Sequence, residues 1–435
     1  MAKTPKEVTP FADAEPVAAN GLLHRRLFLS GGAFFAGASA LSGVLGAPPA
    51  SAQMATVPDW RKEPGKSFTP YGVPSRFEEP VQRLVTVRAP SYPSPGAGSS
   101  RTPLHLLEGI ITPSGLHFER SHSGVPDIDP DRHRLLVHGL VRQPLVFDLD
   151  ALMRYPRVSA IHFIECAGNS GGGWAVQPPV GFVATMHGLI SCSEWTGVPL
   201  HYLLEEAGID PKAKWILAEG IDAAAMSRSV PLDKCLDDAM VALFQNGERI
   251  RPEQGYPMRL LLPGWEGNMN VKWLHRIKLT EGPTHTKDET SKYTELMPDG
   301  KSMQFSFPME VKSVITRPSE GLNMQGPGFY EISGFAWSGN GKVKRVDVSA
   351  DSGASWAEAA LEEPIASRAL TRFRLPWQWD GKEVILQSRA TDETGAVQPT
   401  RAELIGSKGV KNAYHYNGIT TWEVRASGLV KNVWA

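Results

Sequence analysis

The stretch IHFIECAGNSGGGW, residues 161–174, places a lone cysteine where an apolar run gives way to a glycine-rich loop. Residues 160–165 have the composition of a strand, and Cys166 follows them directly. Because glycine lets a backbone approach a ligand closely, the loop predicts that this thiol is presented to something. Three interpretations stay open: a buried structural cysteine, a nucleophile with His162 or another histidine as its base, or a metal ligand.

On either side of this loop, short apolar runs alternate with stretches of helical period. The alternation predicts a mixed α/β unit over residues 102–306, which includes a polar, turn-rich connection near its end. Its clearest predicted elements are strands at 134–141 and 160–165 and helices at 148–154 and 200–207.

From residue 307 to residue 435 the pattern changes to short apolar runs separated by turn residues, and it contains no convincing helix. Apolar and polar residues alternate along 384–390, as they do in a half-buried strand. This spacing predicts an immunoglobulin-like β-sandwich. The predicted strands cover 329–337, 343–349, 372–377 and 383–390.

The amino end reads HRRLFLS at residues 24–30, followed by an apolar Gly/Ala-rich run at 31–47 and small residues at 50 and 52. This order predicts a twin-arginine signal peptide over residues 1–52, with an amphipathic helix or anchor as the alternative. The twin-arginine route exports folded proteins that have acquired a cofactor, so we expect a cofactor and a periplasmic location. A Pro/Gly/Ser-rich segment, residues 53–101, predicts an extended arm.

Composition narrows the classes of function. The 435 residues carry 45 basic and 46 acidic side chains, so no surface of the nucleic-acid-binding type is expected. The cysteine count of 3 is odd, and whether Cys192 pairs with Cys235 stays open. The sequence has no Cys-x-x-Cys-His motif and hence no c-type haem attachment. Electrons from a redox reaction would therefore leave through a separate cytochrome.

Residues 165–169, Glu-Cys-Ala-Gly-Asn, resemble the signature of sulfite oxidases, in which the cysteine thiolate binds molybdenum beside the two dithiolene sulfurs of molybdopterin. Further blocks at 118–130, 255–274 and 346–399 match the family in the same order. The resemblance implies an α+β chain: a mixed α/β molybdopterin-binding domain followed by an immunoglobulin-like dimerisation domain. It also implies a molybdenum–molybdopterin cofactor and an oxidoreductase acting on sulfur compounds.

The resemblance assigns roles to six residues. Cys166 is the metal ligand, and a soft anionic thiolate suits a sulfur-coordinated metal. His122, Arg259 and Lys272 bind the cofactor, whose phosphate needs a cationic cradle. Arg120 faces the sulfur substrate and Tyr293 lies near the metal, so these two are the expected catalytic residues.

Two departures from the family pattern are informative. Ser170 and Gly171 stand where animal and plant sulfite oxidases have two arginines, and Asn417 stands about where a third would come. Each missing charge-assisted contact removes about 1.5–3 kcal/mol of binding to a small dianion. Smaller residues also open space, so we expect a bulkier substrate, such as a sulfane sulfur carried on a cysteine of another protein.

That pattern resembles the molybdenum subunit of the sulfane dehydrogenases of thiosulfate-oxidising (Sox) systems. The resemblance implies a dihaem c-type cytochrome, a sulfur-carrier protein, a homodimer through residues 307–435 and a heterotetramer with the cytochrome. No nucleic-acid partner and no stable membrane span after signal removal are expected. The alternatives are a sulfite dehydrogenase acting on free sulfite, a non-catalytic periplasmic binding protein, and a thiol hydrolase using Cys166.

Overall fold

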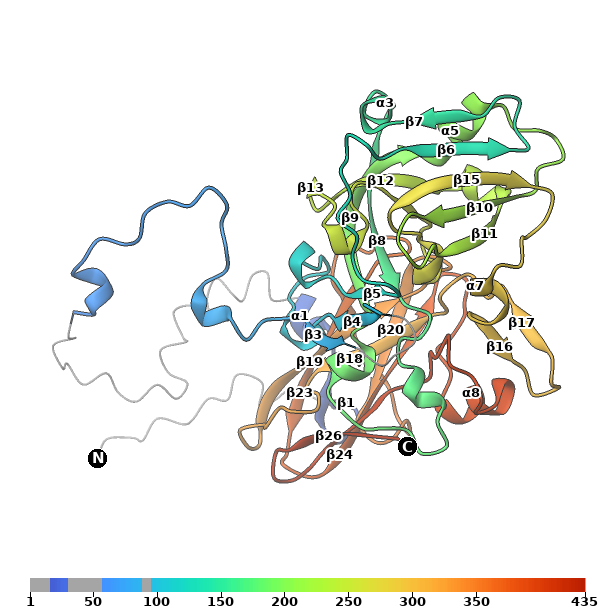
Figure 1. Ribbon diagram of the computed structural model, residues 1–435. Helices are drawn as coiled ribbons and strands as arrows, with labels where there is room; N and C mark the ends of the chain where they lie inside the picture. The colour runs from blue at the N-terminus through green and yellow to red at the C-terminus, as the bar shows by residue number, and fades with distance from the viewer. Residues whose placement is uncertain (1–15, 30–56, 88–94, 435) are drawn as a thin grey trace, which may run out of the picture.

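A computed structural model describes residues 16–29, 57–87 and 95–434 (Figure 1). The apolar run at 31–47 and the small residues at 50 and 52 lie outside these ranges. The twin arginines lie inside them, at the start of the short helix α1 (Arg26–Leu29). Among the described residues, no helix has the length and apolar character that a membrane crossing requires.

Two five-stranded sheets build the half of the molecule that carries Cys166 (Figure 1). Most residues of the central strands of the second sheet are buried, as in a strand covered on both faces. The first sheet, in spatial order, holds β11 (Ser227–Pro231), β10 (Trp215–Gly220), β15 (Leu274–Thr280), β6 (Leu135–Gly139) and β7 (Leu145–Phe147). The second holds β13 (Glu248–Arg249), β12 (Met240–Gln245), β9 (Ile190–Pro199) and β8 (Val158–Glu165), with β14 (Arg259–Leu261) on β12.

Short helices connect and cover these sheets. Asp148 caps the first of them, because its side chain accepts a hydrogen bond from the Ala151 amide. The longest packs its leucines into the core of the first sheet. The helices are α3 (Leu149–Met153), α4 (Val183–His187), α5 (Leu200–Ala207), α6 (Leu232–Asp237) and α7 (Lys287–Thr290), and α7 leads into the hairpin β16 (Thr294–Leu296) and β17 (Ser302–Gln304).

The carboxy-terminal half is a sandwich of two antiparallel sheets, as the sequence predicted, around a core rich in tryptophan. One sheet holds β1 (Pro16–Ala18), β2 (Leu22–Leu23), β23 (Thr371–Trp379), β19 (Gly328–Trp337) and β18 (Lys312–Arg317), with β22 (Ala360–Leu361) on β23. The other holds β21 (Ala357–Glu358), β20 (Val343–Ser349), β24 (Val384–Asp392), β25 (Thr421–Val424) and β26 (Val430–Val433).

The expectation of no helix in this half is wrong. Helix α8 (Arg401–Lys408) follows Thr400, which accepts a hydrogen bond from the Glu403 amide while the Glu403 carboxylate accepts one from the Thr400 amide. This reciprocal capping box satisfies backbone donors that would otherwise be lost at the helix start. The Thr-x-x-Glu spacing was visible in the sequence, but the surrounding strand pattern obscured it.

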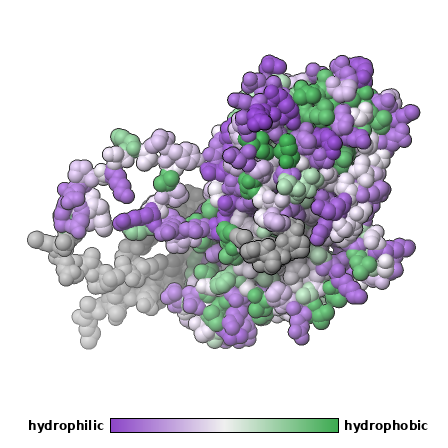
Figure 2. Space-filling view, in the orientation of Figure 1, coloured by the Kyte–Doolittle hydropathy of each residue, from purple (hydrophilic) through white to green (hydrophobic). Residues whose placement is uncertain are grey.

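The predicted arm is partly a strand. β3 (Leu84–Val87) pairs with β4 (Gly98–Arg101), which pairs with β5 (Glu119–Ser121), the strand that carries Arg120. Residues 57–80 project from the body (Figure 1), and the apolar side chains of Phe68 and Phe77 on them are exposed. Between these two residues, the Tyr71 hydroxyl donates to Glu248 on β13 over 2.8 Å. Figure 2 shows hydrophobic residues scattered along this projection among hydrophilic ones.

Candidate active site

A buried network of hydrogen bonds fixes the loop that follows β8. The Asn169 side chain donates to Glu165 Oε1 over 2.9 Å and accepts from the Leu189 amide over 3.1 Å. Glu165 also accepts from Lys312 Nζ at 3.1 Å and from Trp337 Nε1 at 2.6 Å. Both of these donors belong to the carboxy-terminal sandwich, so the backbone that bears Cys166 is fixed by both halves of the chain.

A glycine makes room directly against this loop. A Cβ on Gly267 would lie 2.9 Å from the Glu165 carbonyl oxygen and 3.3 Å from Cys166 Cα. Only a residue without a side chain permits this approach. The turn that carries Asn268 therefore lies against Cys166 and forms part of the pocket wall.

All six residues that the sequence singled out line one pocket: Arg120, His122, Cys166, Arg259, Lys272 and Tyr293. They come from five separate stretches of chain, and the empty space that they surround, including its open mouth, is about 660 Å³. The other lining residues are His117, Phe118, Ser121, Ile164, Asp222, Met226, Gln254, Gly267, Asn268, Asn270, Val271 and Trp273.

Arg259 is buried and Lys272 is half-buried, and among the described residues neither side chain donates a hydrogen bond to a carboxylate. The Arg259 guanidinium donates to the carbonyls of Gln254 and Asn270, both at 2.9 Å, and its Nε has no partner. Lys272 Nζ donates to Ser121 Oγ at 3.1 Å and to the Glu253 carbonyl at 3.0 Å. Burial lowers the pKa of Arg259 to about 9 and that of Lys272 to about 7.

These two side chains fit an anionic ligand. A buried cation without a counter-ion is unfavourable, so a phosphate beside Arg259 would offset its charge and use the open Nε, while the charges of Glu119 and Asp222 already act on Lys272. The donor set therefore matches the phosphate and pterin of the expected cofactor. Burial and the Arg120 charge lower the pKa of His122 to about 3, so its ring is neutral in this structure, and its part in binding the cofactor stays a prediction.

Tyr293 and Arg120 form the other side of the pocket. Tyr293 Oη and His122 Nε2 are hydrogen bonded at 3.1 Å, and the Arg228 guanidinium lies 5.0 Å from the centre of the tyrosine ring. Burial raises the pKa of Tyr293 well above its ordinary value, and the nearby Cys166 adds to the shift. The hydroxyl is thus protonated at neutral pH. Arg120 reaches this region from β5, where its guanidinium donates to the Gly98 carbonyl over 3.3 Å.

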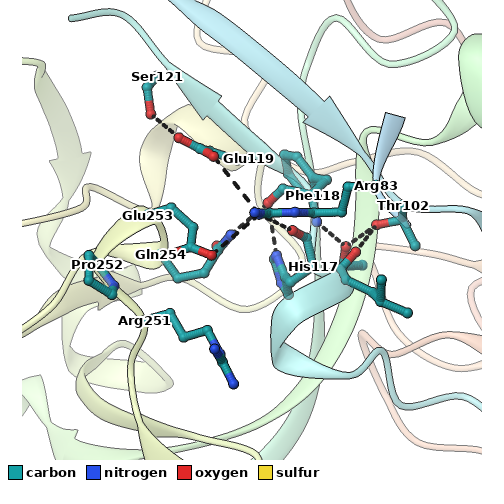
Figure 3. Close-up of polar contacts among 12 residues, drawn as sticks. Arg83, Thr102, His117, Phe118, Glu119, Ser121, Arg251, Pro252, Glu253 and Gln254 are labelled. Carbon is teal, nitrogen blue, oxygen red and sulfur yellow. Dashed lines mark hydrogen bonds and ion pairs between the residues drawn. The ribbon is translucent and has the colours of Figure 1, made fainter. Parts of the chain in front are cut away.

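Arg83 ties the projecting arm to the strand that carries Arg120 (Figure 3). Its Nη1 donates to the His117 carbonyl at 3.2 Å and lies 3.4 Å from Glu253 and 3.9 Å from Glu119. Gln254, beside Glu253, donates to the Phe118 carbonyl at 2.7 Å. The arm thereby joins β5 to the loop that contacts Arg259 and Lys272.

The surroundings of Cys166 separate the interpretations left open by the sequence. Burial raises the pKa of its thiol, which disfavours a free thiolate nucleophile. His162 does not line the pocket, so it is not placed to act as a base for this thiol. The described residues contain no group of three or more His, Cys, Asp or Glu side chains that could hold a metal. A metal at Cys166 would need ligands from outside the chain, as a dithiolene supplies.

Neither Ser170 nor Gly171 lines the pocket, so the wider mouth expected from these small residues stays a prediction. Ser170 Oγ is buried, at 2.7 Å from Lys312 Nζ and 2.6 Å from His187 Nδ1. Asn417 likewise lies outside the lining and donates to the Val311 carbonyl over 3.2 Å. None of the three supplies the positive charge of an arginine, so the expectation of a less positive site is unaffected.

Sequence reasoning missed a second layer of charged and aromatic residues behind Tyr293. The Tyr414 ring lies 5.2 Å from the Tyr293 ring. Next to it, His415 Nε2 lies 3.4 Å from the Glu266 carboxylate, which also pairs with Arg228 at 3.1 Å. These residues come from distant parts of the chain and share no local motif. No sequence pattern predicted the positive φ of 54° at His415.

The cysteines also settle one question. Cys166, Cys192 and Cys235 all carry free thiols, and the latter two are buried. Their pairing, which the sequence left open, does not occur. The single thiol at the pocket is the one that the glycine loop presents.

Two protein-family models match the chain: "Oxidoreductase molybdopterin binding domain" over residues 122–287 and "Mo-co oxidoreductase dimerisation domain" over residues 304–422. Mitochondrial sulfite oxidase of Mus musculus is 32% identical, covering 71% of this chain and 61% of the mouse protein. Sulfite oxidase of Gallus gallus is 30% identical, covering 68% of this chain and 69% of the chicken protein. The chain thus spans about three fifths of the mouse protein's length.

A solved structure, that of the sulfane dehydrogenase SoxCD from Paracoccus pantotrophus, superposes with a TM-score of 0.85. Its matched chain is 46% identical, and the match covers 89% of this chain and 99% of that one. The match extends over both halves of the fold. The chain belongs to the sulfite oxidase family of molybdopterin-binding oxidoreductases.

Proposed function

We propose that the chain is the molybdenum-binding subunit of a periplasmic sulfane dehydrogenase that oxidises carrier-bound sulfane sulfur during thiosulfate oxidation. The observation that carries the proposal is the single pocket that Cys166, Arg120 and Tyr293 line together with the cations Arg259 and Lys272. The likeness to the Paracoccus pantotrophus sulfane dehydrogenase, at 46% identity, supports the choice of substrate.

In this proposal the chain holds its cofactor with three kinds of group. Cys166 supplies a thiolate to the metal, Arg259 and Lys272 neutralise the phosphate, and His122 offers a neutral ring nitrogen. The molybdenum–pterin group, when bound, supplies the two-electron oxidation of sulfur and the transfer of a water-derived oxygen atom.

The residues around the substrate act by charge and hydrogen bonding. Arg120 attracts the negative charge that develops as the sulfur gains oxygen. Tyr293 keeps its proton, because burial raises its pKa, so the hydroxyl can donate a hydrogen bond to an oxyanion. His122, which is neutral, holds that hydroxyl in place when no substrate is bound.

The partners that we propose follow from the missing haem-attachment motif and from the dimerisation domain. Because its sequence has no haem-attachment motif, the chain would pass its electrons to a separate c-type cytochrome, which we propose to be a dihaem subunit. A sulfur-carrier protein would deliver the substrate. The dimerisation domain supports self-association, and we propose a heterotetramer with the cytochrome. The twin arginines at 25 and 26 support export to the periplasm.

The second candidate is a sulfite dehydrogenase acting on free sulfite, which the likeness to sulfite oxidases of mouse and chicken favours. Purified holoprotein with its cytochrome separates the two. We expect cytochrome reduction to be faster with sulfane sulfur on the carrier protein than with free sulfite at equal concentration. The reverse order would establish the sulfite dehydrogenase instead.

Replacing the thiol tests the cofactor assignment. We expect Cys166→Ser to fold and to retain pterin while losing turnover, because an alcohol is a poor donor to a sulfur-coordinated metal. Cys235→Ser, buried in the core of the first sheet, is the matched control and should retain molybdenum and turnover. Metal analysis and X-ray absorption at the molybdenum edge give the readout. A Cys166→Ser protein with unchanged turnover would refute the assignment.

A further inference from the structure

The amino-terminal segment before the apolar run is bound to the carboxy-terminal sandwich. Residues 16–23 form two short strands joined by one turn, and β2 adds to the sheet beside β23, with Leu22 opposite Trp377. Leu22 and Leu23 have exposed fractions of 0% and 1%, and Leu22 belongs to the core of the sandwich. A segment predicted to be a removable leader therefore fills a site on the folded domain.

Polar contacts fix this segment along the turn. The indole of Trp377 donates to the Asn20 carbonyl over 2.8 Å. Asn20 Nδ2 donates to the Ala350 carbonyl over 2.7 Å, and the Ala19 amide donates to Ser355 Oγ over 3.0 Å. The partners lie on β23 and on the loop between β20 and β21. These partners become adjacent only when the sandwich has folded. The segment therefore binds the folded domain and not its unfolded chain.

Gly21 makes the fit specific. Its φ is +84°, and a Cβ there would lie 1.9 Å from the Gln378 carbonyl oxygen. That contact is with backbone, which cannot swing aside as a flexible side chain could. Only glycine at this position lets the segment lie against β23.

One of the two arginines is held by the same surface. Arg25 forms an ion pair with Glu358 of β21, and both side chains are about one third exposed. Such an exposed pair adds little to stability. Its effect is on position, because it keeps Arg25 against the sandwich at the point where α1 begins.

We propose that the edge formed by β23, together with the loop between β20 and β21, is a binding site for a peptide, namely this chain's own residues 16–25. While the peptide is docked, Arg25 is withheld from the machinery that recognises paired arginines. The withholding rests on the proposed export, whereas the docking does not. The ligand class is an extended segment with a turn containing glycine, two adjacent leucines and a following arginine.

Hydrogen exchange of the full chain tests the docking. We expect the amides of residues 16–25 to exchange at least about tenfold more slowly in the wild type than in Gly21→Ala, because only the docked segment is protected. Val17→Ala is the control, since the Val17 side chain is largely exposed and its loss should leave protection unchanged. Equal exchange in the wild type and Gly21→Ala would overturn the binding site.

Pulse–chase processing of the precursor in cells tests the withholding. Glu358→Gln should be processed about two- to fivefold faster than the wild type, the shift that an exposed ion pair carries. The control is Glu362→Gln, whose carboxylate pairs with Arg374 instead, and it should match the wild type. Identical rates for Glu358→Gln and the wild type would overturn the withholding. A second variant, in which both arginines are replaced by lysine, tests the export route itself. Unchanged processing of that variant would mean that the twin arginines do not direct export, whatever the result for Glu358→Gln.

Discussion

At the scale of single residues, the buried pair of His415 and Glu266 leads to a prediction about how stability depends on pH. Burial alone would lower the pKa of His415, but the hydrogen bond to Glu266 and the charges of Glu266 and Glu295 outweigh it and raise the pKa. A histidine whose pKa is raised by folding stabilises the protein fully below its unfolded pKa. That contribution is lost as the pH rises through the folded value.

We therefore expect His415→Asn, which tolerates the positive φ at this position, to lower the free energy of unfolding more in acid than in alkali. The deficit should be about 2 kcal/mol at about pH 6, the strength of a hydrogen bond to a charged group, and should shrink by about pH 9. Thermal unfolding of both proteins across this range is the measurement. A deficit that grows with pH would contradict the pairing.

The sequence predicted individual pocket residues where the chemistry imposes a residue type. Cys166 stood out because a thiol before a glycine loop is unusual, and the resemblance supplied Arg120, Arg259 and Lys272. All of them line the pocket, although their roles in binding and catalysis stay predictions. The sequence did not indicate Tyr414 and Arg228, because they matter only through their contacts with Tyr293 across the fold.

At the scale of elements, helix α8 shows where a local signal was overlooked. The alternation of apolar and polar residues correctly predicted strands β20 and β24, and a short apolar run between turn residues predicted β19. Eight residues of helix between two strand-rich stretches carried a weaker period. Its capping box is the stronger signal.

That capping box can be tested directly. Thr400→Ala should lower the free energy of unfolding by about 1 kcal/mol, because the Glu403 amide loses its acceptor. Thr400→Ser keeps a hydroxyl at the same place and should stay close to the wild type. Chemical denaturation of the three proteins measures the difference. Equal losses for alanine and serine would show that the hydroxyl's hydrogen bond is not what stabilises the helix start.

At the scale of the whole molecule, Lys312 joins the two halves. It lies on β18 of the sandwich, and its buried ammonium bonds to Glu165 at the base of the Cys166 loop. Lys312→Met should lower the free energy of unfolding by about 3–5 kcal/mol, since removing one partner leaves the other buried and unpaired. Adding Glu165→Gln should recover part of that loss, because the stranded charge is then gone.

The matched control is Lys382→Met, whose ammonium pairs with Asp380 at an exposed turn. We expect its stability to stay close to that of the wild type, because the pair is exposed to solvent. The midpoints of thermal unfolding of the four proteins, compared at one pH, give the answer. A Lys312→Met protein as stable as the Lys382→Met protein would mean that the seam does not depend on this pair.

The link from Lys312 to Glu165 also bears on how the enzyme is assembled. The loop that offers its sulfur to the metal takes its shape from a side chain more than a hundred residues further along, in the other half of the chain. A nascent or truncated catalytic half would thus present Cys166 on a loop that keeps its contacts to Leu189 but lacks those to the sandwich. We therefore expect metal loading to follow the synthesis and folding of both halves, and to precede export.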